Sequence, residues 1–379
     1  MIHKINITLC VTIALLVIAG MFSCKKKDKD IFSVEGTLEN VEGSHFYTSY
    51  EVGDSVQIDT IAIGENGKFS FTGKVDTLTV MSLYFNNNTK NIFILVNKGW
   101  NIQMEGDALY PDLIDIKGGK VNDDLTEFKN KNKELLKMRA DILMAVEDEN
   151  TENDSLPVKN YVAELRNTNF ELSNIAASYI KANPEKVASV MLANAFFKDE
   201  SSIPRLDESL NLFKGRALDF PMTEELRRYR DKVKKSAVGS YAPLFTAEDI
   251  KGKEVKLVDY RDKYVLLSFA ATTCDVCKDE KKDAIKVYND LKKQKKNIEF
   301  VTVVKDIETV PLSKNISDSV KWTILPVKGG WSASVFDTYY IRGIPYHILI
   351  SPRGYILERD ISLDAIAGKI ESLEPKDKK

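Results

Sequence analysis

The sequence predicts a multidomain protein, with an antiparallel β-sandwich at residues 31–120, an α-helical region at 121–236 and an α/β domain at 237–379. Its 379 residues are more than one domain of ordinary size uses. Short β-type segments give way to helical spacing near residue 121, and strand and helix patterns alternate from about residue 237. Three consecutive regions of different structural class are therefore expected along the chain.

Composition excludes several classes of protein. Hydrophobic residues make up 43% of the chain and charged residues 29%, as in globular proteins. The formal net charge of −2 offers no basic field for nucleic acid, so we expect no nucleic-acid partner. With three histidines and four cysteines, the chain can hardly supply a structural zinc site. We therefore expect no metal and no cofactor beyond what a cysteine pair can provide.

The N-terminus reads as an export signal at residues 1–23. A short basic start is followed by an apolar run at 7–22 and then by Cys24. This resembles a bacterial lipoprotein signal, in which Cys24 becomes the lipidated first residue and 24–30 forms a tether. The chain would then sit in the envelope of a Gram-negative-type bacterium, facing the periplasm. Met21 and Phe22 are bulkier than usual there, so an uncleaved anchor and a soluble secreted protein are the alternatives.

The β-rich region consists of short segments in which β-branched and aromatic residues are frequent. Asn66-Gly67 supplies the positive φ angles of a hairpin turn. Seven strands at this spacing favour a sandwich. They are expected at 32–38, 44–51, 55–63, 68–75, 78–85, 91–96 and 101–106.

The middle of the chain is expected to be helical, with breaks at Pro184, Pro204 and Pro221. The last third then begins with residues 264–271, a continuous apolar run typical of a strand buried on both faces. An amphipathic helix follows around 284–291, and a second buried strand at 298–304 completes a βαβ unit. Further strands are expected at 346–350 and 355–359, and a closing helix near 363–373.

Cys274 and Cys277 lie where the first of these strands meets its helix. This spacing at a helix N-terminus brings both sulfurs to one end of the helix, where its dipole favours a thiolate. Cys274 is then the attacking thiol and Cys277 the resolving one. An inert disulfide is the alternative, but closing so small a loop adds little stability.

Residues 240–280, with Gly343-Ile344-Pro345, resemble the thioredoxin-like reductases tethered to bacterial envelopes, the TlpA/ResA-type group. The matching pieces include residues 242–245, 252–253 and 255–260, the strand and the cysteine pair. The resemblance spans about 140 residues and implies a thioredoxin fold for 237–379. The β-rich region resembles the uncharacterised N-terminal region of such lipoproteins, which implies architecture and no activity.

The resemblance also implies roles for individual residues. Glu280 matches a family glutamate involved in proton transfer, although a solvated first-turn glutamate is an equal alternative. Pro345 matches a cis-proline, which would present the Ile344 backbone to a substrate strand. His347 is expected to be a packed, hydrogen-bonded strand residue rather than a copper ligand.

The chain departs from the family pattern at several positions. Tryptophans usual in the family are replaced by Ala270 and Thr273, and the proline before the second cysteine by Val276. The buried acidic residue of thioredoxins falls at Ser268. Trp322 and Trp331 either pack in the core or line a substrate groove, and packing is favoured.

The leading hypothesis is an envelope-anchored thiol–disulfide oxidoreductase, which takes electrons from a membrane donor and reduces disulfides of exported proteins. Asp275, Val276 and Glu280 oppose the Cys274 thiolate, so we expect a reductant with a potential near roughly −270 mV. A thiol peroxidase is one alternative, but its Pro and Thr motif positions hold Leu267 and Ala271. A non-catalytic binding or scaffolding lipoprotein with a drifted thioredoxin domain is the other.

Overall fold

The computed structural model describes residues 29–53, 55–85, 90–149, 158–305 and 320–373. These residues form two compact units. The N-terminal unit runs to Phe196 and includes Phe213–Leu218, and the C-terminal unit comprises Phe197–Leu212 and the chain from Asp219 onward. The predicted signal and Cys24 lie outside the described residues. Within those residues, no helix is both long and apolar enough to span a membrane.

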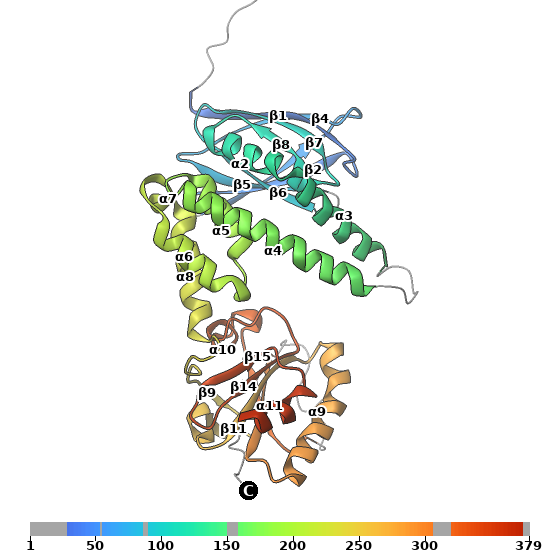
Figure 1. Ribbon diagram of the computed structural model, residues 1–379, viewed down its shortest axis with the longest axis vertical. Helices are drawn as coiled ribbons and strands as arrows, with labels where there is room; N and C mark the ends of the chain where they lie inside the picture. Colours follow the sequence, from blue (N-terminus) through green and yellow to red (C-terminus); the bar gives the residue numbers. More distant parts are fainter. Residues whose placement is uncertain (1–28, 54, 86–89, 150–157, 306–319, 374–379) are drawn as a thin grey trace, which may run out of the picture. The chain divides into compact units, whose positions relative to one another are not determined.

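The N-terminal unit is built on two four-stranded sheets, in the orders β4-β1-β7-β8 and β3-β2-β5-β6. Figure 1 shows them as two layers. Seven of the eight strands lie where the sequence predicts them, and the short β8 was not expected. The strands are β1 (Ile31–Glu39), β2 (His45–Val52), β3 (Ser55–Ala62), β4 (Lys68–Lys74), β5 (Thr79–Phe85), β6 (Lys90–Val96), β7 (Asn101–Asp107) and β8 (Asp115–Lys117).

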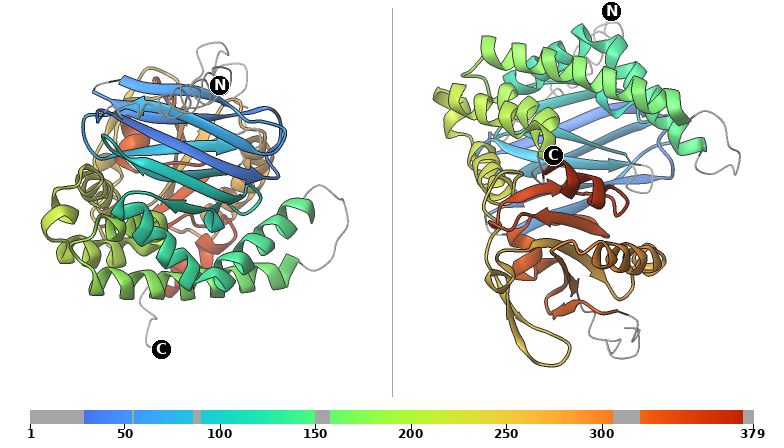
Figure 2. Two further views of the ribbon diagram at one scale, coloured as in Figure 1. Left: turned by 90° about the horizontal axis from the view of Figure 1, so that it is seen from above. Right: turned by 60° about the horizontal axis from the view of Figure 1, so that its bottom comes forward.

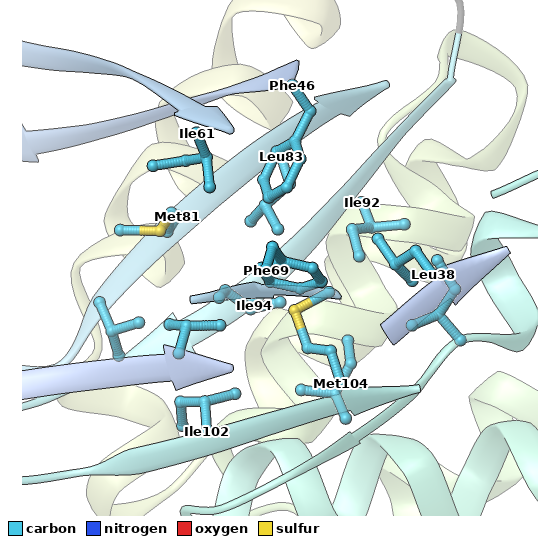
Figure 3. Close-up of a cluster of buried hydrophobic side chains, with 14 of the residues drawn as sticks. Leu38, Phe46, Ile61, Phe69, Met81, Leu83, Ile92, Ile94, Ile102 and Met104 are labelled. Carbon is cyan, nitrogen blue, oxygen red and sulfur yellow. The ribbon is translucent and has the colours of Figure 1, made fainter. Parts of the chain in front are cut away.

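One apolar core lies between these sheets. Phe69 and Met104 come from one sheet, Phe46 and Leu83 from the other, and all four are buried (Figure 3). Along β1, β2, β5 and β7, alternate residues point into this core, as expected for sheets with one face buried, whereas β3 buries only Ile61. The expectation of a wholly antiparallel arrangement is wrong at one pair, because β1 and β7 run parallel. Between β1 and β7 in sequence, the chain forms β4 and all four strands of the second sheet. Two parallel strands need such a long connection.

Helix α2 (Lys120–Lys131) closes one edge of each sheet with its side chains. Asn122 accepts a hydrogen bond from the Leu95 N–H (3.0 Å) and donates one to the Leu95 carbonyl (2.8 Å). Thr126 does the same for Ile116 of β8, at 3.0 and 2.8 Å. These two side chains occupy the place of a neighbouring strand and satisfy backbone groups at otherwise open edges.

Residues 121–236 are helical, as the sequence predicts, and their helices are divided between the two units. Helices up to α5 belong to the N-terminal unit, whereas α6 and α8 belong to the C-terminal unit. The remaining helices of this region are α3 (Lys133–Glu149), α4 (Val158–Ala182), α5 (Val187–Phe197), α6 (Ile203–Leu212), α7 (Gly215–Asp219) and α8 (Pro221–Lys235), with 3₁₀ turns η1 (Pro111–Leu113) and η2 (Glu200–Ser202).

The C-terminal unit contains a five-stranded sheet in the order β13-β12-β11-β14-β15. β11, β12 and β13 are parallel, and β14 and β15 are antiparallel to their neighbours. A small hairpin of β9 (Thr246–Glu248) and β10 (Glu254–Lys256) precedes it. The sheet strands are β11 (Tyr264–Ala271), β12 (Ile298–Lys305), β13 (Thr323–Val327), β14 (Tyr346–Ile350) and β15 (Ile356–Arg359).

Both faces of this sheet are covered, as the continuous apolar run in β11 predicts. Helices α9 (Asp275–Lys293) and α11 (Ala365–Leu373) pack on one face, and α9 runs along the sheet in Figures 1 and 2. The other face packs against α10 (Ser334–Thr338) and the 3₁₀ turn η3 (Leu257–Tyr260). Residues alternate between the two cores, so that Leu266 faces α9 whereas Leu267 faces α10.

Candidate active site

The cysteine pair lies at the junction of β11 and α9, as the sequence predicts. Cys274 is the N-cap of α9, and its Sγ accepts a hydrogen bond from the Cys277 N–H at 3.1 Å. The two cysteines are joined by a disulfide, with their Cα atoms 5.3 Å apart. An unpaired N–H at a helix start stabilises negative charge on a neighbouring atom. The same N–H therefore stabilises a thiolate on Cys274 once the bond is reduced.

The charged residues of the first turn of α9 offset one another. Lys278 Nζ lies 2.7 Å from Asp275 Oδ1, and this contact lowers the pKa of the Asp275 carboxyl. Both side chains are exposed, at 56% and 88%. The positive charge nearest in sequence to the pair is therefore already matched by a carboxylate.

The Ile344–Pro345 segment approaches the pair from the neighbouring strand. Its peptide bond is cis, and Pro345 immediately precedes β14. β14 pairs with β11 in register, with Tyr346 opposite Phe269 and His347 opposite Ser268. This register places Pro345 beside the end of β11, from which Cys274 follows.

A cavity of about 220 Å³ lies next to the pair, and both Cys277 and Pro345 line it. Its apolar wall includes Phe300 and Trp322, which pack with their ring centroids 5.5 Å apart. Trp322 also donates a hydrogen bond from Nε1 to Thr302 Oγ1 (2.9 Å). Trp322 therefore packs in the core and also forms one wall of this cavity. Trp331 is 45% exposed instead, and Lys305 lies over its ring.

The same cavity is also lined by a hydrogen-bonded chain of three side chains, Ser268, His347 and Glu280. His347 Nδ1 is 2.8 Å from Ser268 Oγ, and His347 Nε2 is 3.1 Å from Glu280 Oε2. His347 and Ser268 are each only 8% exposed, and Glu280 is partly exposed at the cavity. His347 thus has a partner on both ring nitrogens, and Glu280, in the second turn of α9 rather than the first, is hydrogen-bonded and not merely solvated.

Sequence reasoning named these three residues but did not connect them. The two predicted strands at 264–271 and 346–350 could have indicated this contact, because an antiparallel pairing between them can set Ser268 opposite His347. Among the described residues, no group of three or more His, Cys, Asp or Glu side chains is placed so that it could hold a metal ion.

Comparison with known proteins addresses this unit and the β-rich region separately. Residues 238–359 match the AhpC/TSA family, and residues 32–125 match a domain of unknown function, DUF4369. The thiol-disulfide oxidoreductase ResA of Geobacillus kaustophilus is 31% identical over 142 residues, covering 37% of this chain and 79% of that relative. The chain belongs to the ResA-type thiol-disulfide oxidoreductases.

This oxidoreductase has further relatives of the same kind. ResA of Bacillus cereus is 27% identical over 131 residues, which are 34% of this chain and 73% of that protein. Among solved structures, the thioredoxin domain of a thiol-disulfide oxidoreductase from Bacteroides vulgatus is 30% identical, with a TM-score of 0.33 over 36% of this chain and 97% of that one. These two ResA relatives thus match about a third of this chain.

Proposed function

We propose that this oxidoreductase is anchored in the cell envelope and reduces disulfides of exported proteins, with Cys274 as the attacking thiol and Cys277 as the resolving thiol. The observation that carries the proposal is the position of Cys274 at the N-cap of α9, where the Cys277 N–H donates to its sulfur. Only a thiolate attacks a disulfide efficiently, and this hydrogen bond favours the thiolate.

The reaction proceeds in two exchanges. The Cys274 thiolate attacks one sulfur of the substrate disulfide, and the other substrate sulfur leaves as a thiolate. Cys277 then attacks Cys274, which releases the second substrate thiol and forms the Cys274–Cys277 disulfide. We infer that an extended substrate segment pairs with the backbone of Ile344, which precedes the cis peptide bond and the start of β14. A membrane electron donor must return two electrons to the pair after each turnover.

The surroundings of the pair support reduction rather than oxidation as the physiological direction. A strong oxidant needs a stabilised thiolate. Here the Lys278 charge is matched by Asp275, Val276 is apolar, and Glu280 adds a second carboxylate one turn on. The thiol peroxidase alternative lacks support, because Leu267 and Ala271, at the positions of its motif, are buried apolar residues of β11.

Disulfide exchange by cysteine variants tests the proposal. With a reduced protein and a disulfide-bonded substrate, Cys274→Ser should abolish reduction, because no sulfur remains to attack. Cys277→Ser should instead accumulate a mixed disulfide with the substrate, visible as a mass increase that dithiothreitol removes. Activity retained by Cys274→Ser would contradict the assignment. If neither substitution changes the reaction, the binding or scaffolding alternative is favoured.

A further inference from the structure

Cys277 must lose a proton before it can resolve the mixed disulfide. A free thiol has a pKa of about 8.5, so at neutral pH most of it is protonated. Cys277 lies inside the first turn of α9 and shares its cavity with Glu280, three residues further along the same helix. Residues three apart lie on one face of a helix. The cavity volume of about 220 Å³ also leaves room for water between them, since one water takes up about 30 Å³.

We propose that His347 is a positioning residue for the resolving step. Through its hydrogen bond to Glu280, His347 holds the proton that Cys277 releases. The proposal rests on the proposed function and adds to it a residue with no part in the first exchange. It follows from the hydrogen-bonded chain Ser268–His347–Glu280, which ends at the cavity that Cys277 lines.

Ser268 makes both protonation states of His347 acceptable. With a neutral ring, Nε2–H donates to the Glu280 carboxylate and Nδ1 accepts from the Ser268 hydroxyl. With a charged ring, both nitrogens donate, and the hydroxyl turns to accept from Nδ1. The pair of Glu280 and His347 therefore passes from a net charge of −1 to 0 without an unpaired buried nitrogen.

No other charged group near the hydrogen-bonded chain Ser268–His347–Glu280 takes the place of His347 as the partner of Glu280. On α9, Lys278 and Lys281 line the same cavity, and Lys278 is engaged by Asp275. The parts of β11, β12 and β13 that line the cavity carry no charged side chain. On β15, Glu358 is paired with Lys369 of α11.

The step is balanced in atoms and electrons. Cys277 gives its proton to the Glu280–His347 pair, and the resulting thiolate attacks Cys274 Sγ. A Cys274–Cys277 bond forms while the bond from Cys274 to the substrate sulfur breaks. The substrate sulfur leaves with the electron pair and takes up a proton, so the substrate is reduced and the protein is oxidised.

Reaction with 5,5′-dithiobis(2-nitrobenzoate) separates the two exchanges. In the full chain with Cys10→Ser and Cys24→Ser, reduced protein releases one coloured thiolate when Cys274 attacks and a second when Cys277 resolves. His347→Gln keeps a hydrogen-bonding side chain that cannot accept the proton. We expect its second release to slow about ten-fold at pH 6.5 and to recover by about pH 9.5, where a thiol ionises unaided. The first release should stay within about two-fold.

Two further variants keep the test decisive if His347→Gln does not fold. Ser268→Ala should slow the second release with the same pH dependence, because it removes the partner of Nδ1. Thr302→Val removes another hydroxyl that lines the same cavity, one that is bonded to Trp322 and not to His347, and should leave both releases unchanged. A second release with an unaltered pH profile in His347→Gln and Ser268→Ala would overturn the role of His347. Loss of the first release in the parent chain would instead contradict the proposed function.

Discussion

The Arg359 guanidinium, at the end of β15, donates a hydrogen bond from Nη1 to the carbonyl of Ser236 at 2.8 Å, just past the end of α8. The same side chain also donates to Ser236 Oγ, to the Tyr339 carbonyl and to Glu200, at 2.9, 3.0 and 3.0 Å. It is only 8% exposed. One largely buried arginine side chain thus holds the end of α8 and the turn η2 against the sheet edge, and all these elements belong to the C-terminal unit.

Replacing Arg359 should destabilise the C-terminal unit. We expect Arg359→Lys to cost about 2–4 kcal/mol, because a lysine cannot reach all these acceptors and leaves buried carbonyls unpaired. Denaturant unfolding can be followed by tryptophan fluorescence in a Trp100→Phe background, which leaves tryptophans only in this unit. The control is Arg353→Lys at an exposed position, for which a change within about 0.5 kcal/mol is expected. Equal effects of both variants would show that the buried contacts contribute nothing.

The N-terminal unit should become more stable between pH 8 and 10. Burial lowers the pKa of Lys129 to about 8, while its ammonium donates to the Ile114 carbonyl. Above pH 8 the folded state has released this proton, but the unfolded chain holds it until about pH 10.4. The unfolded state therefore binds more protons in this window, and stability rises with pH.

This rise should be absent from Lys129→Met, because the variant has no proton to release at this site. It should persist in Lys131→Met, whose lysine is exposed and paired with Glu127. Denaturant unfolding followed by Trp100 fluorescence, with Trp322 and Trp331 replaced by Phe, measures the slope in each chain. The same slope in Lys129→Met as in the parent chain would assign the pH dependence to other groups.

The reduction potential of the pair should lie toward the thioredoxin end of the range, near roughly −270 mV. Equilibration with dithiothreitol or glutathione buffers measures it directly. Val276→His should raise the potential, because a positive ring between the cysteines stabilises the thiolate and so the reduced form. Val276→Leu is the matched control and should leave the value unchanged. A potential near −120 mV in the parent protein would make it a disulfide donor rather than a reductase.

Cys24 should be the first residue of the mature protein and should carry lipid. Mass spectrometry of the protein from a bacterial envelope is expected to show an N-terminal peptide with acyl chains on Cys24, and Cys24→Ser should release the protein from membranes. Two or more acyl chains anchor a protein stably, whereas one does so only marginally. A mature N-terminus elsewhere, with an unmodified Cys24, would contradict this expectation.

Local patterns in the sequence predicted most strands and the position of the pair, because alternation and buried runs are properties of consecutive residues. They missed β13, a short edge strand that contains Pro326, a residue tolerated only at such an edge. They also missed the parallel pairing of β1 with β7 and the division of the helices between two units. These depend on contacts between distant residues, such as Arg359 with Ser236, that no local periodicity encodes.

The position of β1 between β4 and β7 has a mechanical consequence. A tether ending at residue 30 would pull directly on Ile31, the first residue of a strand that is hydrogen-bonded along both sides. Pulling along the strand loads many of these bonds at once, whereas an edge strand could be peeled away one bond at a time. The attachment point would therefore resist force in shear, and tension on the anchor would be borne by the sheet before it reached the redox domain.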